Sequence, residues 1–138
     1  MLNKFTSAIL AGIVFGILIG ITAALPCLIF ISLVLMVILG AITVYLARGD
    51  IKNSADALIS SGLAGGISGI VGAVAATAWM TLIVFFAKYH NSEVFSVREI
   101  SGLGIYGLVC APVLIVSGVL MAAVGGFVYY ELVAKKGK

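Results

Sequence analysis

Charged side chains are absent from three long segments of this 138-residue chain, residues 5–47, 57–87 and 100–130. A helix needs about 20 apolar residues to cross the hydrocarbon of a bilayer. The first segment is long enough for two crossings, and each of the others exceeds one untilted crossing. The pattern therefore predicts an all-α, polytopic membrane protein whose single domain, residues 1–138, is a compact bundle of four transmembrane helices. These helices are expected at about residues 5–25, 27–47, 55–87 and 97–131.

Two prolines interrupt the apolar segments. Proline lacks a backbone N–H group and disfavours helical geometry in the residue before it, so the chain is expected to reverse at Pro26. A re-entrant hairpin at the same place is the alternative. Pro112 lies inside the last segment, where it predicts a kink.

Polar residues mark the expected starts of the third and fourth helices. Asn53 and Ser54 are suited to cap the third helix, and Asp56 in its first turn favours the helix dipole. The segment Ser96–Glu99 is typical of a capping box and precedes the fourth helix.

Lysine and arginine are distributed unevenly between the two sides that four crossings create. These residues are enriched in the cytoplasmic loops of membrane proteins. One side holds six of the eight and the other holds two, so we expect both termini in the cytoplasm and the helices in the cell (plasma) membrane. The six are Lys4, Arg48, Lys52, Lys135, Lys136 and Lys138, and the two are Lys88 and Arg98.

Small residues recur every four positions along three of the expected helices. Such rows let two helix backbones approach closely, which gains dispersion contacts and weak Cα–H hydrogen bonds. We interpret them as helix-packing surfaces, either within one chain or between copies of it. The second helix is bulkier and is expected on the lipid-facing outside. The rows comprise Ala8, Gly12, Gly16, Gly20 and Ala24 in the first helix, Ser61, Gly65, Ser68, Gly69, Gly72 and Ala76 in the third, and Gly118, Ala122 and Gly126 in the fourth.

The two halves of the chain contain short matching segments. Leu10–Gly12 matches Leu63–Gly65, and further matches follow at the same spacing. Both stretches begin on the same expected side, so a parallel repeat of two hairpins, residues 1–52 and 53–138, would explain the match. Chance similarity between helices rich in glycine and alanine is the alternative.

Residues that usually carry membrane chemistry are missing from the middle of the expected spans. Ionisable residues inside a span mark proton relays, ion paths and substrate sites, whereas the acidic residues and His90 of this chain lie near span ends or in loops. One histidine and two distant cysteines, Cys27 and Cys110, form no metal-ligand or acid–base pattern. We predict no catalytic, metal or cofactor-binding residues and no enzymatic activity. The composition, with 63% hydrophobic residues, 9% charged residues and a mean hydropathy of +1.31, agrees with a protein solvated by lipid.

One stretch resembles a known group of proteins. Residues 40–50, which end in Gly49-Asp50, are followed by Ala55–Ala57 and by the glycine rows that run to Ala76. This order is similar to small four-span membrane proteins of unknown function, found chiefly in archaea, which have a proline-containing turn after the first helix and a glycine-rich third helix. The resemblance implies the same fold and brings no activity with it.

Two hypotheses about function follow. The first is a non-enzymatic integral membrane protein with a structural or accessory role, which packs or oligomerises through the glycine rows as a homo-oligomer or beside a larger membrane-protein partner. The alternative is a small oligomeric channel or carrier for a neutral or hydrophobic solute, assembled through the row Ala8–Ala24. Both hypotheses have the lipid bilayer as a partner, and neither involves nucleic acid.

Overall fold

The computed structural model describes residues 3–23, 28–91 and 97–134 of the chain. Nearly all of these residues are helical and none of them forms a strand, so the all-α prediction with four helices is confirmed. A short π-helical segment, which the sequence did not indicate, continues the last helix. The elements are α1 (Lys4–Ala23), α2 (Ile29–Leu46), α3 (Ser54–Asn91), α4 (Val97–Tyr129) and the π-helical η2 (Tyr130–Ala134).

The largest difference from the expected boundaries is at the end of α3. This helix continues to Asn91 instead of ending near residue 87, so Lys88 and His90 extend it rather than forming a loop. The last turn of a helix carries partial negative charge, and basic side chains there are favourable.

Of the two predicted proline features, only the one at Pro112 lies in the part of the chain that the structure describes. Helix α4 passes through Pro112 without interruption. The predicted turn at Pro26 lies outside the described residues, and so does Ser96, the expected cap of α4.

Three of the described helical stretches are long and apolar enough to cross a membrane. They are α1, Ser54–His90 in α3, and Gly107–Val133 in α4 and η2. Helix α2 is also apolar, over Phe30–Leu46, but it is shorter. The lengths and compositions of these helices indicate a membrane protein.

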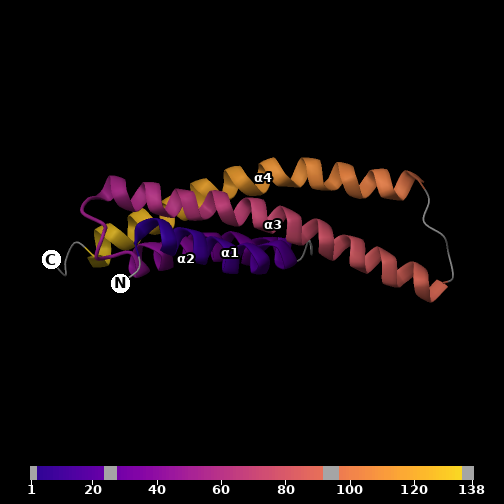
Figure 1. Ribbon diagram of the computed structural model, residues 1–138, viewed down its shortest axis with the longest axis horizontal. Helices are drawn as coiled ribbons and strands as arrows, with labels where there is room; N and C mark the ends of the chain where they lie inside the picture. Colours follow the sequence, from indigo (N-terminus) through magenta and orange to yellow (C-terminus); the bar gives the residue numbers. More distant parts are fainter. Residues whose placement is uncertain (1–2, 24–27, 92–96, 135–138) are drawn as a thin grey trace.

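The helices are arranged as two hairpins of unequal length that lie side by side (Figure 1). Helix α1 packs along α3 in the same direction, and α2 packs along α4. The start of α1, the link between α2 and α3, and η2 meet at one end of the molecule. Because α1 and α2 have 20 and 18 residues while α3 and α4 have 38 and 33, the first hairpin covers only part of the second. Beyond it α3 and α4 diverge as two arms, residues 77–91 and 97–111, which we call the distal arms (Figure 1).

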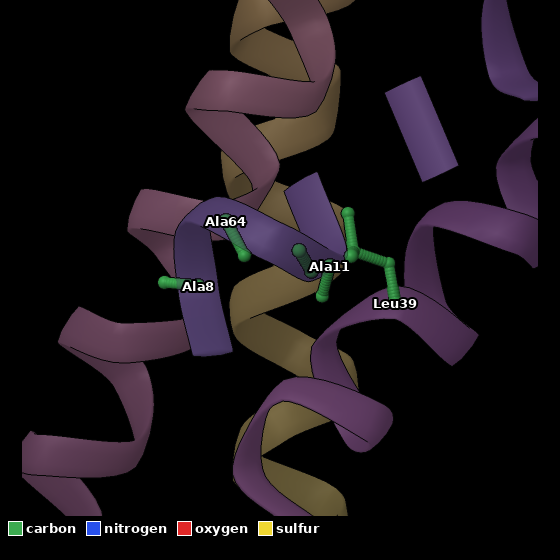
Figure 2. Packing of buried hydrophobic residues seen from close by; sticks show 5 residues of the cluster. Ala8, Ala11, Leu39 and Ala64 are labelled. Carbon is green, nitrogen blue, oxygen red and sulfur yellow. The ribbon is translucent and has the colours of Figure 1, made fainter. Parts of the chain in front are cut away.

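The core of the four-helix part is built from small side chains. One cluster takes Ala8 and Ala11 from α1, Leu39 from α2 and Ala64 from α3, with Ala122 of α4 completing it (Figure 2). Four of these five residues are alanines, which draws the helix axes together. The side chains that point outward are large and apolar, including Ile9, Ile13, Val14 and Ile17 on α1, and this agrees with a surface that faces lipid.

The expectation that the second helix lies on the outside is wrong for one of its faces. Met36, Leu39 and Val44 of α2 are buried inside the bundle, and so are the small residues Ser32 and Gly40. The reason is physical: large apolar side chains suit lipid and protein interior equally, so bulk alone does not reveal which face is buried.

Candidate functional site

The glycine row of α1 lies directly against α3. A Cβ atom placed on Gly12 would lie 2.9 Å from the Cβ of Ile67, and one on Gly16 would lie 2.7 Å from the Cβ of Val71. On Gly20 it would lie 2.5 Å from the carbonyl oxygen of Gly72. Real Cβ contacts essentially never fall below 3.0 Å, so no side chain fits at these positions without moving a neighbour.

The contact between α1 and α3 keeps one register along its length. The carbonyl oxygens nearest the glycines belong to Ala64, Ser68 and Gly72, each 52 positions after its glycine. The same spacing separates Lys4 from Asp56 at the start of the two helices. Ala8 is fully buried in this contact, whereas Ala24, the last member of the row, lies outside the described residues.

A second close contact joins α3 to α4. Gly65 and Gly118 face each other, and a Cβ atom on Gly118 would lie 2.5 Å from the carbonyl oxygen of Gly65. A Cβ atom on Gly69 would lie 2.5 Å from the Cα of Ile115. Ala122 lies beside Gly65, 2.9 Å from where its Cβ would be. Backbones at this separation leave room for hydrogen atoms only.

A third close contact, between α2 and α4, was not anticipated. A Cβ atom on Gly40 would overlap the carbonyl oxygen of Ala122, and one on Gly125 would overlap the carbonyl oxygen of Val37. Gly126, the last residue of the predicted row on α4, turns instead toward Ser61 of α3. The adjacent glycines Gly125 and Gly126 thus pack against two different helices, α2 and α3. This pair was the feature of the sequence that could have indicated the contact between α2 and α4.

Several serine and threonine hydroxyl groups within the helices bond to the backbones of their own helices. Thr43 Oγ1, for example, donates to the carbonyl oxygen of Leu39 at 2.8 Å. Such bonds satisfy a hydroxyl donor without a partner on another helix. The same pattern holds for Thr22, Ser61, Ser68, Thr77, Thr81 and Ser117.

Charged and polar groups hold the start of α1 to the start of α3. Lys4 Nζ forms a salt bridge with Asp56 Oδ1 at 3.1 Å. The backbone N–H of Lys4 donates to Asp50 Oδ2 at 3.3 Å, and Ser60 Oγ donates to the carbonyl oxygen of Lys4 at 3.3 Å. Three contacts from one residue therefore fix this end of α1.

The link between α2 and α3 is held from both sides. Asn53 caps α3 as expected, since its Oδ1 accepts from the backbone N–H of Asp56 at 2.9 Å. Asp56 Oδ2 accepts from the N–H of Lys52 at 3.3 Å. The Tyr130 hydroxyl in η2 donates to the carbonyl oxygen of Lys52 at 3.0 Å, so η2 is tied to the same loop.

The distal arms form an apolar groove of about 970 Å³ where they diverge. Near its middle a Cβ atom on Gly107 would lie 3.0 Å from Thr77 Oγ1, so α3 and α4 still touch there. At Gly104, one turn further out, a Cβ atom would meet nothing within 4 Å. The lining includes Ala73, Thr77, Thr81, Gly104, Gly107 and Ala111.

The described residues show no group of three or more histidine, cysteine, aspartate or glutamate side chains that could hold a metal ion. His90 is exposed near the end of α3, and the backbone of Cys110 lies within α4. Cys27 lies outside the described residues.

No family model, curated protein or solved structure matches this chain. The resemblance to small archaeal four-span proteins stays a prediction for that reason.

Proposed function

We propose that this protein is a non-enzymatic structural or accessory component of the cell membrane, that both of its termini are cytoplasmic, and that it associates with a copy of itself or with a larger membrane protein. The observation that carries the proposal is the length of the distal arms. The glycine rows are occupied by contacts within the chain, which is one of the two interpretations given above, and we therefore assign association to the arms.

The apolar part of α3 is too long for an ordinary crossing. Its uncharged residues, 57–87, rise about 46 Å at 1.5 Å per residue, whereas the hydrocarbon is about 30 Å thick. Fitting them inside by tilting would require about 50°, above the usual range of about 0–40°. Helix α1, with 20 residues, rises about 30 Å and matches the hydrocarbon without such a tilt.

The surplus length lies in the arms and carries large apolar side chains. Phe85, Phe86 and Tyr89 near the end of α3 are 50%, 65% and 79% exposed. Apolar surface that extends beyond the hydrocarbon is costly in water, and large exposed patches of this kind mark contacts with other proteins. A partner that covers the arms would remove this cost.

The charge distribution supports the proposed orientation. Lys4, Arg48 and Lys52 lie at the end where α1 begins, and Lys88 lies near the opposite end, on a distal arm. Positive charge on one side favours that side as cytoplasmic. In that orientation the arms extend toward the outer face of the membrane.

The test is the mass of the complex in which the protein is found. A polymer that keeps neighbouring membrane proteins and lipid attached is used to extract it from the cells that make it. We expect a protein mass above the 14.2 kDa of one chain. Phe86→Ser on the arm should reduce it toward that value, and Phe30→Ser should not, because Phe30 is similarly exposed at 77% but lies on α2. A monomeric mass for the unmodified protein, or equal effects of the two substitutions, would overturn the proposal.

The groove between the arms favours one second candidate, a carrier or channel for a neutral or hydrophobic solute. Assembly of a pore through the row from Ala8 to Gly20 would have to displace α3, so a pathway along the groove is the form of this candidate that the contacts support. Reconstituted vesicles distinguish it from an accessory role. Entry of a small neutral solute such as glycerol faster than into empty vesicles would favour transport, and equal rates would favour the accessory role.

A further inference from the structure

In the four-helix part, the crease between α3 and α4 is filled by side chains from the first hairpin. Ile19 of α1 and Met36 of α2 are almost fully buried there, against Ala73 of α3 and Leu114 of α4. The chemical groups that fill the crease are therefore short alkyl and thioether chains. On the α3 side the crease presents Ala73, whose methyl group leaves room for these longer chains.

The groove is the continuation of this crease beyond the first hairpin. Ala73 belongs both to the buried cluster and to the groove lining, and Ala111 packs against the cluster and also lines the groove. Further along, the same helix faces present Thr77 and Thr81 opposite Gly107 and Gly104. Among the residues that the structure describes, none fills this part of the crease as Ile19 and Met36 fill the other.

The two hydroxyl groups of the described lining residues already donate to backbone carbonyl oxygens. Thr77 Oγ1 donates to the carbonyl oxygen of Ala73 at 2.9 Å, and Thr81 Oγ1 donates to the carbonyl oxygen of Thr77 at 2.8 Å. The other lining residues that the structure describes are aliphatic or glycine. A polar ligand would give up hydrogen bonds to water that the described lining does not replace, whereas a hydrocarbon chain has no hydrogen bonds to lose.

The contact between α3 and α4 inside the groove favours a thin occupant. Thr77 and Gly107 touch at a point between the pair Ala73 and Ala111 and the pair Thr81 and Gly104. A helix with side chains is about 10 Å across and cannot enter between two helices that touch. A chain of methylene groups can lie along the groove from Ala73 and Ala111 to Thr81 and Gly104.

We propose that the groove between the distal arms binds a hydrocarbon chain of a membrane phospholipid, which continues the row of side chains begun by Ile19 and Met36. The volume of about 970 Å³ is at the upper end of the roughly 300–1,000 Å³ of ligand pockets, enough for one long chain. Ala73, at the inner end of the groove, lies about 24 Å along the uncharged part of α3, within the roughly 30 Å of hydrocarbon, so the chain enters the groove at this end from the outer leaflet. This inference requires only that the helices lie in a membrane and does not rest on the accessory role.

The test uses a phospholipid with a photoactivatable diazirine in its acyl chain, mixed into vesicles of phosphatidylcholine and phosphatidylglycerol that contain the protein. Illumination followed by peptide mass spectrometry locates the attached chains. We expect several-fold more labelling per residue at Thr77, Thr81 and Leu108 than at Ile13 and Val14, which are exposed on α1 and report ordinary surrounding lipid. Equal labelling at the two places would overturn the proposal.

Two glycines of α4 provide a matched pair of variants. A Cβ atom on either Gly102 or Gly104 would meet nothing within 4 Å, but only Gly104 lines the groove. Gly104→Leu should reduce groove labelling to the level of α1, and Gly102→Leu should leave it high. Thr81→Leu, which fills the groove from α3 and breaks no contact between helices, should act like Gly104→Leu.

Other outcomes identify a different occupant. Low labelling in the groove of the unmodified protein, together with a complex mass that falls in Gly104→Leu, would show that a second protein chain fills it and would overturn the proposal. Labelling that persists in both Gly104→Leu and Thr81→Leu would place the lipid elsewhere. The mass measurement proposed above can fail while groove labelling succeeds, so the two proposals are separable.

Discussion

Gly65 of α3 and Gly118 of α4 lie back to back, so that a Cβ atom on Gly118 would lie 2.5 Å from the carbonyl oxygen of Gly65. This contact joins the two longest helices of the molecule. Within the bilayer the hydrophobic effect does not drive helices together, so the packing of backbones at such contacts supplies much of the attraction.

The first prediction compares Gly65 with its neighbour Gly66. In Gly65→Ala the new methyl group would overlap the carbonyl oxygen of Gly118, and overpacking of this kind typically costs about 1–3 kcal/mol. In Gly66→Ala the methyl group would lie 3.5 Å from Val119 Cγ2, an ordinary contact, and the better helix propensity of alanine favours folding by up to about 1 kcal/mol. Denaturant unfolding in detergent micelles should show opposite signs, and equal destabilisation would contradict the assigned contacts.

The second prediction separates packing within the chain from packing between chains. Gly16→Leu forces a large side chain against Ser68 and Val71 and should lower the free energy of unfolding by about 3 kcal/mol or more. Ile17→Leu, on the exposed face of α1, should change little. Loss of the folded monomer in Gly16→Leu fits a contact within the chain. A variant that stays folded and loses only a higher oligomer would show that the row of α1 packs against another copy.

The third prediction concerns the salt bridge between Lys4 and Asp56. Lys4→Glu places a carboxylate beside Asp56 and Asp50 and should destabilise the protein, more strongly at low than at high salt. Adding Asp56→Lys should restore part of the loss, because the pair is reversed rather than removed. The effect should be small, since both side chains are partly exposed. Unfolding measured at two ionic strengths tests the idea, and a double variant no better than Lys4→Glu alone would refute it.

The fourth prediction tests the orientation. In a chain whose Cys27 and Cys110 are replaced by alanine, a single cysteine is placed at Gly49 or at His90, which are exposed at opposite ends of the bundle. A thiol reagent that cannot cross membranes should label His90→Cys on intact cells and Gly49→Cys only after permeabilisation. Labelling of both positions on intact cells would refute the proposed topology.

Much of the fold could be predicted because several separate patterns in the sequence indicate the same helices and helix contacts. Glycines four positions apart lie on one face of a helix, and Gly12, Gly16 and Gly20 therefore had to share a neighbour. Asn53 as the cap of α3 followed from its side-chain oxygen and its place before the apolar segment. These features depend only on neighbours along the chain.

Two features could not be predicted in the same way: the contact between α2 and α4, and the groove between the distal arms. Gly40 stands alone among bulky residues, and Gly125 is set off from the row that contains Gly118 and Gly126, so neither forms a four-residue pattern of its own. The groove depends on where the first hairpin ends beside the second, which is a relationship between distant segments. In lipid the outward side chains are as apolar as the inward ones, and the sequence therefore carries little signal for either feature.

The even spacing of the small residues has a consequence for how α1 finds its place. If α1 slid forward along α3 by one helical turn, Gly12, Gly16 and Gly20 would move from Ala64, Ser68 and Gly72 to Ser68, Gly72 and Ala76, which are also small. The backbone of α3 alone therefore gives little preference between these two positions. The contacts of Lys4 with Asp50, Asp56 and Ser60 form in only one of them, so polar groups at the end of the bundle help to set the axial position of the whole helix.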